Sequence, residues 1–121
     1  MEGRVKLLGL EEKVAEKAKA NGWHVELRKK HGRRIQDLIL QRGRLVLVVQ
    51  VKDLSGPAGP KAVTQTKRDF DEYVRHLLEE ELGVTVVPIL VSNEISERAK
   101  RRALSYGIRH YRPNELEKML K

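Results

Sequence analysis

The chain lacks cysteine, so it has no disulfides, no thiolate metal site and no thiol nucleophile. The cytoplasm is therefore the simplest compartment to expect. Aromatic residues are also few, with one Trp, one Phe and three Tyr, which argues against base stacking as the main mode of contact with a nucleic acid. No apolar run approaches the roughly 20 residues needed to span a bilayer, and the first residues lack the apolar core of a signal peptide. These absences exclude enzymes that use a thiol nucleophile or a thiolate-bound metal, and they predict no contact with a membrane.

Positive charge is abundant by contrast. The 25 Lys and Arg residues outnumber the 17 Asp and Glu residues, which gives a net charge of +8 and a pI near 9.9. This balance favours a polyanionic partner such as a nucleic acid, although solubility alone is the simpler explanation. A length of 121 residues fits one domain, which we expect to cover 1–121.

Hydrophobic periodicity and turn residues predict nine elements in the order αβββαβαβα. A tight turn at Arg42-Gly43 joins two of the strands, and Ser92 or Asn93 is expected to cap the third helix. Pro88 cannot donate to a sheet ladder, so a neighbouring strand should be missing there, or the strand should bulge. The expected helices are 7–20, 60–82, one ending near 106 and one from 113, and the expected strands are 23–27, 35–41, 44–52, 84–91 and 108–111. This pattern predicts an α/β fold with a mixed sheet and helices on both faces.

The most apolar strand, 44–52, ends with two polar residues on the same face, Gln50 and Lys52. Burying an amide and an ammonium costs free energy unless both have partners. If Gln41 pairs with Arg44 across a two-residue turn, Asp37 lies diagonal to Gln50 on that face. A three-residue turn would reverse the parity and separate them.

A carboxylate, a carbonyl and a lysine in one place suit phosphodiester hydrolysis. Hard divalent cations take oxygen ligands, which Asp37 and the backbone carbonyl of Val51 can supply. Lys52 can orient or deprotonate the attacking water and neutralise phosphate charge, while the metal lowers the pKa of that water. The alternative is that Asp37 caps a turn or forms an isolated ion pair with Lys52.

The pattern Asp37…Gln50-Val51-Lys52 resembles the PD-(D/E)XK nuclease superfamily, and its QXK form is similar to Mrr-type restriction endonucleases. The resemblance extends along most of the chain, through Leu10-Glu11-x-x-Val14-Ala15, Gly22-Trp23, Ser55-Gly56-Pro57, Lys61-Ala62-Val63-x-Gln65, Val91-Ser92-Asn93, Ala99, Ala103, Gly107-Ile108 and Leu116. It implies a restriction-endonuclease-like three-layer α/β/α sandwich with a central mixed sheet. It also implies DNA cleavage that depends on Mg²⁺, or on Mn²⁺ in its place.

The resemblance further implies roles for individual residues. Asp37 matches the metal-binding aspartate, Gln50 the position usually held by a carboxylate, and Lys52 the catalytic lysine. Glu11 matches the glutamate of the first helix, with Glu12 as its substitute. Neither the proline nor the glycine that precedes the acid in the family is present here, and the neutral amide of Gln50 should weaken the hold on a metal. The implied metal ligands are Asp37, Glu11, Gln50 and the Val51 carbonyl.

Two segments are candidates for contact with nucleic acid. The segment 28–34 is expected to be a basic loop whose cations neutralise phosphates, with a solvated hairpin as the alternative. The Gly- and Pro-rich segment 53–60 lacks Walker spacing but can cover a phosphate. The candidate contact residues are Arg28, Lys29, Lys30, Arg33, Arg34, Ser55 and Lys61.

These features predict a Mg²⁺-dependent endonuclease that acts on duplex or branched DNA. A structure-selective Holliday-junction resolvase is the alternative within enzymes. A nuclease fold that has lost catalysis and only binds nucleic acid is the alternative outside enzymes. Two cuts in a duplex need two active sites, so a homodimer is expected for the enzyme.

Overall fold

A five-stranded mixed sheet forms the centre of the computed structural model, which describes residues 9–29, 35–53, 55–78 and 83–121. The side chains of residues 28, 29, 35–37 and 78 lie outside that description. The predicted order αβββαβαβα is confirmed. The elements are α1 (Leu10–Ala20), β1 (His24–Lys29), β2 (Ile35–Arg42), β3 (Leu45–Lys52), α2 (Pro60–Leu78), β4 (Thr85–Ser92), α3 (Glu97–Tyr106), β5 (Arg109–Tyr111) and α4 (Pro113–Met119).

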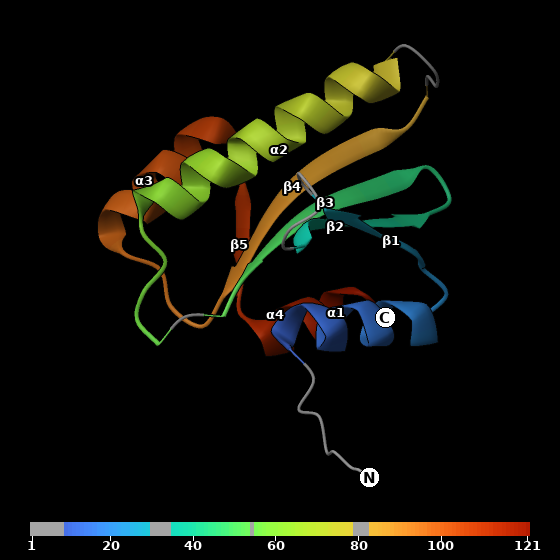
Figure 1. Ribbon diagram of the computed structural model, residues 1–121, viewed down its shortest axis with the longest axis horizontal. Coiled ribbons are helices and arrows are strands. Elements are labelled where there is room, and N and C mark those ends of the chain that lie inside the picture. The colour runs from blue at the N-terminus through green and yellow to red at the C-terminus, as the bar shows by residue number, and fades with distance from the viewer. Residues whose placement is uncertain (1–8, 30–34, 54, 79–82) are drawn as a thin grey trace, which may run out of the picture.

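The strands lie in the order β1-β2-β3-β4-β5. The first three are antiparallel, whereas β3, β4 and β5 are parallel, so the carboxyl ends of these three strands share one edge. Helices α2 and α3 cover one face of the sheet, and α1 and α4 cover the other (Figure 1). The expected three-layer α/β/α sandwich is thereby confirmed. None of the helices, over the residues described, is long and apolar enough to cross a membrane.

Alternation along β3 decides which residues meet which helices. Leu47, Val49 and Val51 belong to the larger apolar cluster, which also contains Val14 and Ala18 of α1. Val46 and Val48 belong to a separate cluster against Phe70 and Tyr73 of α2. Even-numbered positions of β3 therefore face α2, and Gln50 and Lys52 are on this α2 face.

The β2–β3 register differs from the predicted one by two residues. Arg42 pairs with Leu45 and Leu38 pairs with Val49, so the two-residue turn is Gly43-Arg44 rather than Arg42-Gly43. Gly43 has φ +64°, a left-handed conformation that glycine adopts without strain. Because a shift of two residues preserves the side-chain period, the predicted sharing of a face is unaffected.

Several boundaries also differ from the sequence prediction. Arg28 and Lys29 belong to β1, so the expected basic loop is in part a strand. Ser96, rather than Ser92 or Asn93, caps α3, because its side chain accepts a hydrogen bond from the Ala99 N–H. The expectation for Pro88 is confirmed: it pairs with Val48 of β3, whereas β5 begins pairing with β4 only at Ile89.

Trp23 joins the end of the chain to the sheet. It is buried, and its Nε1–H donates to the Leu120 carbonyl at 2.7 Å. The Arg42 guanidinium lies 4.4 Å from the ring centroid and donates to the same carbonyl at 3.2 Å. The residue that follows α4 is thereby tied to the hairpin end of the sheet.

We expect Trp23→Phe to lower the free energy of unfolding by about 2 kcal/mol, because it removes a buried hydrogen bond and leaves a small void. The Arg42 bond to the same carbonyl keeps the loss moderate. Urea unfolding followed by circular dichroism measures it, with the exposed Tyr106→Phe as the control. An unchanged midpoint for Trp23→Phe would contradict this account of the packing.

Candidate functional site

Strands β2 and β3 separate near the end that lies away from their hairpin turn. In the described backbone, β2–β3 pairing stops at Leu38↔Val49, although both strands continue. On its other side, β2 has a bulge, because Arg28 pairs with Asp37 while Lys29 pairs with Ile35. Bulges of this kind often accompany active sites, where they redirect the chain. In the described backbone, the N–H and C=O groups of β3 beyond Val49 are therefore not paired with β2.

Position 37 lies one residue beyond the last β2–β3 pair, beside Gln50 of the facing strand. Leu38 belongs to the cluster on the α1 side, so strand alternation assigns position 37 to the α2 face. The prediction placed Asp37 opposite Val48 and diagonal to Gln50. Continued by one residue, the observed register would set position 37 opposite Gln50 instead. The side chain of Asp37 lies outside the description.

Gln50 is buried, with 4% of its surface exposed, and its Oε1 has no hydrogen-bond partner among the described residues. A buried amide oxygen without a donor costs about 1–3 kcal/mol relative to a satisfied one. A cation, a water molecule or a donor from a ligand would satisfy it. This orphaned oxygen marks the interior of the site.

Lys52 lies at the mouth of the site, half-buried, and lines a cavity of about 230 Å³ between β3 and the start of α2. Lys61 lines the same cavity and is exposed, as expected for a phosphate contact. Ser55 is exposed in the loop that follows β3. Gln65 of α2 contributes to the cavity wall. Two ammonium groups and an amide thus surround a space large enough for a phosphate group.

The two candidate glutamates of the first helix behave differently. Helix α1 packs on the opposite face from Gln50 and Lys52. Helix α1 ends near the β2–β3 hairpin turn, where a tight turn leads from it into β1. The first turn of α1 therefore lies at the other end of the sheet, toward the end of β3. Glu11 is half-buried in that turn, whereas Glu12 is exposed and accepts a hydrogen bond from the Gly9 N–H at 3.0 Å. Glu12 therefore serves the helix cap, and Glu11 remains the candidate ligand.

The basic segment is described only in part. Lys30, Arg33 and Arg34 lie outside the described residues, and only the backbone is described for Arg28 and Lys29. Position 28 pairs with position 37, so the two share a face. Contact between this segment and phosphate stays a prediction.

The donor set suits a hard divalent cation. Position 37 brings a carboxylate, Gln50 a buried oxygen without a donor, and the carbonyl of Val51 lies where β2 no longer pairs with β3. No cluster of three His, Asp or Glu side chains arranged to hold a metal occurs among the described residues, which do not include the Asp37 carboxylate. Asp37 and Glu11 are the two candidate carboxylates, and one or two carboxylates are common for Mg²⁺.

The sequence prediction overlooked two polar features of this region. Asp69 is buried on α2, although its position in a long helix resembles that of an ordinary surface acid. Ser92 and His110 form a 2.8 Å hydrogen bond at the carboxyl ends of β4 and β5. The pairing of parallel strands alone could have revealed the second feature, because Ser92 directly follows one expected strand and His110 lies within the next.

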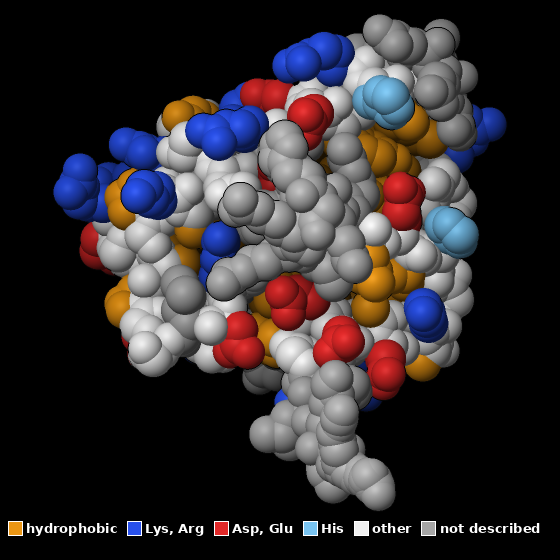
Figure 2. All heavy atoms as spheres, viewed as in Figure 1, with side chains coloured by type: hydrophobic (Ala, Val, Ile, Leu, Met, Phe, Trp, Pro, Cys, Tyr) orange, Lys and Arg blue, Asp and Glu red, His pale blue; other side chains and the backbone are white. Residues whose placement is uncertain are grey.

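Charge is divided between the two helical layers. The ten residues of α3 include Arg98, Lys100, Arg101 and Arg102, all exposed, against a single acid. Figure 2 shows Lys and Arg side chains gathered over the α2 and α3 layer and acidic side chains gathered over α1 and α4. The site opens on the α2 face, so a polyanion would meet the positive layer there.

We expect Gln50→Glu to strengthen binding of Mg²⁺ about tenfold, because it adds a carboxylate to the site. Without metal the buried charge should lower the free energy of unfolding by about 2–4 kcal/mol, and Mg²⁺ should restore most of that loss. Thermal unfolding in EDTA and in Mg²⁺ measures both effects. The control is Gln41→Glu, the same change near the hairpin, which should show no response to Mg²⁺. Equal responses of the two variants would contradict the placement of the site.

No family model matches the chain, and no curated protein sequence matches it. Solved structures do match. A protein of unknown function matches with a TM-score of 0.62 at 21% identity, covering 86% of this chain and 58% of its own. EndoMS without ligand matches with a TM-score of 0.60 at 26% identity, covering 90% of this chain and 48% of its own. A repair endonuclease from Pyrococcus abyssi matches with a TM-score of 0.58 at 24% identity, covering 92% and 49%.

The fold is that of these endonucleases. This agrees with the resemblance to the PD-(D/E)XK superfamily at the level of the fold. EndoMS has also been solved as a complex with double-stranded DNA, and that structure matches with a TM-score of 0.58 at 23% identity, over 93% of this chain and 49% of its own. The chain spans only about half the length of the endonucleases it matches. The likeness therefore concerns about half of each of those chains.

Proposed function

We propose that this chain is a metal-dependent endonuclease that hydrolyses phosphodiester bonds of DNA. The observation that carries the proposal is the buried Gln50 oxygen without a donor, on the β3 face that also carries Lys52 and beside the point where β2–β3 pairing stops. Strand alternation would add position 37 to that face. The fold shared with repair endonucleases and the positive α2 and α3 layer support it. Because one matching structure is a complex with double-stranded DNA, duplex DNA is the substrate class we propose.

Each residue has a distinct role in the proposed reaction. Asp37, Gln50 and the Val51 carbonyl would hold Mg²⁺ or Mn²⁺, with Glu11 as a further candidate from the first turn of α1. The bound ion would supply positive charge to the phosphate and lower the pKa of the attacking water. Lys52 orients the water and neutralises charge that develops on the phosphate oxygens. Lys61 and the basic segment position the backbone of the substrate.

Incubation with plasmid DNA in Mg²⁺, and in parallel in EDTA, tests the proposal. We expect nicking or linearisation in Mg²⁺ or Mn²⁺ and none in EDTA. Retention of full cleavage activity in EDTA, or by Asp37→Ala, would contradict the assignment.

The substrate panel also separates the narrower possibilities. Faster cutting of four-way junctions than of linear duplex would favour a resolvase, and efficient cutting of linear duplex would favour an enzyme like the Mrr-type endonucleases. A homodimer belongs to the proposal because paired cuts need two sites. Sedimentation analysis with and without DNA measures that assembly.

A binding module without catalysis is the second candidate, and the neutral amide of Gln50 favours it. An amide in place of a carboxylate leaves one negative charge fewer to attract a divalent cation. This candidate predicts DNA binding that weakens steeply with salt and no turnover in any divalent metal.

A further inference from the structure

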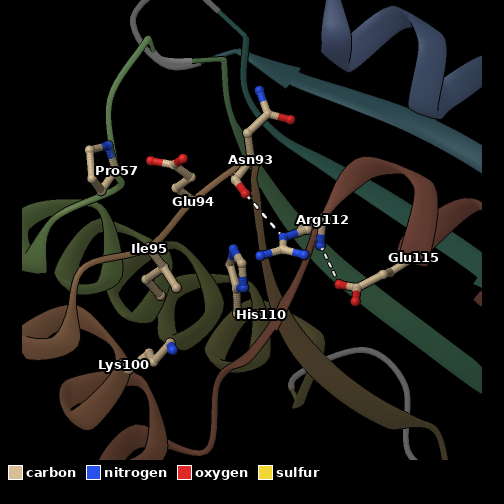
Figure 3. Close-up of a pocket in the computed structure, with 8 residues that line it drawn as sticks. All are labelled: Pro57, Asn93, Glu94, Ile95, Lys100, His110, Arg112 and Glu115. Carbon is tan, nitrogen blue, oxygen red and sulfur yellow. Dashed lines mark hydrogen bonds between the residues drawn. The ribbon is translucent and has the colours of Figure 1, made fainter.

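A second polar cavity, of about 500 Å³, opens beside the candidate site, at the carboxyl ends of β4 and β5 (Figure 3). Its walls come from four segments: the loop after β3, the loop after β4, helix α3, and the segment from β5 into α4. The lining residues are Pro57, Asn93, Glu94, Ile95, Lys100, His110, Arg112 and Glu115.

The two loops are held together by backbone bonds. Ala58 donates to the Glu94 carbonyl at 2.9 Å, and Ser96 donates to the Ala58 carbonyl at 3.0 Å. These bonds fix Pro57 against the segment that follows β4. The cavity is therefore shaped by hydrogen-bonded backbone before any ligand binds.

Three nitrogen-bearing side chains converge on the cavity from three elements. Figure 3 shows the Lys100 ammonium and the Arg112 guanidinium on either side of the His110 ring. Arg112 Nε donates to the Asn93 carbonyl at 3.3 Å, which restrains the guanidinium. Lys100 forms an exposed ion pair with Glu97 at 3.6 Å, a kind of contact that contributes little and that an anion can replace.

The hydrogen bonds of Ser92 determine which ring nitrogen of His110 carries a proton. Ser92 Oγ donates its only proton to the Glu94 carbonyl at 2.7 Å, so at 2.8 Å it accepts from His110 Nε2–H. Nδ1 is then the nitrogen that gains a proton when the ring becomes charged. A charged His110 thus acquires a new donor for an anion.

The cavity lies in line with the candidate site. Gln50 pairs with Leu90, and Leu90 pairs with His110, so these three residues form a row across one face of the sheet. Two strand spacings separate β3 from β5, about 10 Å. A nucleic-acid backbone bound at Lys52 and running along this edge would pass the cavity within one or two phosphates.

We propose that this cavity is a phosphate site formed by Lys100, His110 and Arg112, and that its occupant is a backbone phosphate of DNA next to the one cleaved. The choice of DNA rests on the proposed function, whereas the phosphate chemistry does not. A free nucleotide or inorganic phosphate offers the same group, so the experiment must distinguish these sources.

Two carboxylates in the cavity wall allow the direction of each charge effect on anion binding to be tested. Glu115 is engaged by the Arg112 backbone N–H at 2.8 Å, as part of the cap of α4. Glu94 is exposed in the cavity wall and opposes an anion. Removing the charge of Glu94 should therefore strengthen binding, whereas removing that of Lys100 or Arg112 should weaken it.

Burial lowers the pKa of His110 below its usual value, and the neighbouring Arg112 and Lys100 charges lower it further, against the opposing effects of a hydrogen bond to the Ser92 backbone and of the Glu115 charge. An anion in the cavity favours the charged ring and raises that pKa again. Affinity for the anion should then increase as the pH falls from about 7.5 to about 5.5. His110→Gln keeps a donor for Ser92 and removes the titration, so its affinity should lack this extra dependence on pH.

The test measures binding of a fluorescent duplex oligonucleotide in EDTA, by anisotropy over a range of salt and pH, so that cleavage plays no part. We expect Lys100→Gln and Arg112→Gln each to weaken binding about 3- to 10-fold and to reduce the salt slope by about one contact. Glu94→Gln should strengthen binding. Arg101→Gln, a matched loss of charge on α3 away from the cavity, should have a smaller effect.

A second experiment follows the magnetic resonance signals of the His110 ring while inorganic phosphate or the oligonucleotide is added separately. A response to both supports the proposal. A response to inorganic phosphate alone keeps the phosphate site but overturns DNA as its occupant. The proposal as a whole is overturned if neither probe moves the resonances, or if Arg101→Gln weakens binding as much as the two cavity variants. These results do not depend on catalysis, so a failure of the proposed nuclease activity would be recognised separately.

Discussion

Replacing Lys52 by methionine is expected to lower the rate of DNA cleavage by about 10²- to 10⁴-fold. Methionine matches the length of the lysine stem, so the half-buried packing beside α2 is largely kept, whereas the charge and the proton donor are lost. Single-turnover cleavage of a labelled duplex, with enzyme in excess, measures the chemical step directly.

The matched control is Lys118→Met, an exposed change on α4 at the opposite face of the sheet. It should cleave at the rate of the unaltered protein. Stabilisation by Mg²⁺ should survive in Lys52→Met, because lysine is not a ligand. A Lys52→Met enzyme that cleaves at the normal rate would remove lysine from the proposed chemistry.

Asp37→Asn should abolish both cleavage and the response to metal. We expect a fall in rate of about 10³-fold, because the carboxylate proposed to hold the metal with Gln50 becomes neutral. Binding of Mg²⁺ at about ten times its dissociation constant would stabilise the unaltered protein by about 1.4 kcal/mol, and this gain should vanish in the variant. Thermal unfolding with increasing Mg²⁺ measures it.

Asp71→Asn provides the comparison for this change. Asp71 pairs with Lys67 at 2.7 Å on the partly exposed side of α2, and it has no place in the site. Its Mg²⁺ response and its cleavage rate should match those of the unaltered protein. Together, the lysine and aspartate variants separate loss of chemistry from loss of metal, since only Asp37→Asn should lose the stabilisation.

Much of the fold follows from local patterns in the chain. The continuous apolar run from Leu45 to Val49 predicted a central strand, and the structure pairs that strand on both sides. Gly107 predicted the end of α3, and it adopts φ +73° there. The exact hairpin register was missed, because Arg42-Gly43 and Gly43-Arg44 are both reasonable two-residue turns, and pairing energy along the whole strand decides between them.

The site was only partly accessible to such reasoning. Alternation placed Gln50 and Lys52 on one face, and a register shift of two residues preserved their relation to position 37. Nothing local predicted that β2 would bulge and separate from β3, which is a property of the assembled sheet. The cavity around His110 was missed for the same reason, because Lys100, His110 and Arg112 meet only when the parallel strands are in register.

Anomalous diffraction from crystals soaked in Mn²⁺ tests the central claim most directly. The account predicts a metal peak on the α2 face, within coordination distance, about 2–2.6 Å, of both an Asp37 carboxylate oxygen and Gln50 Oε1. A peak elsewhere on the molecule, with Gln50 Oε1 bonded to a protein donor at saturating Mn²⁺, would contradict it.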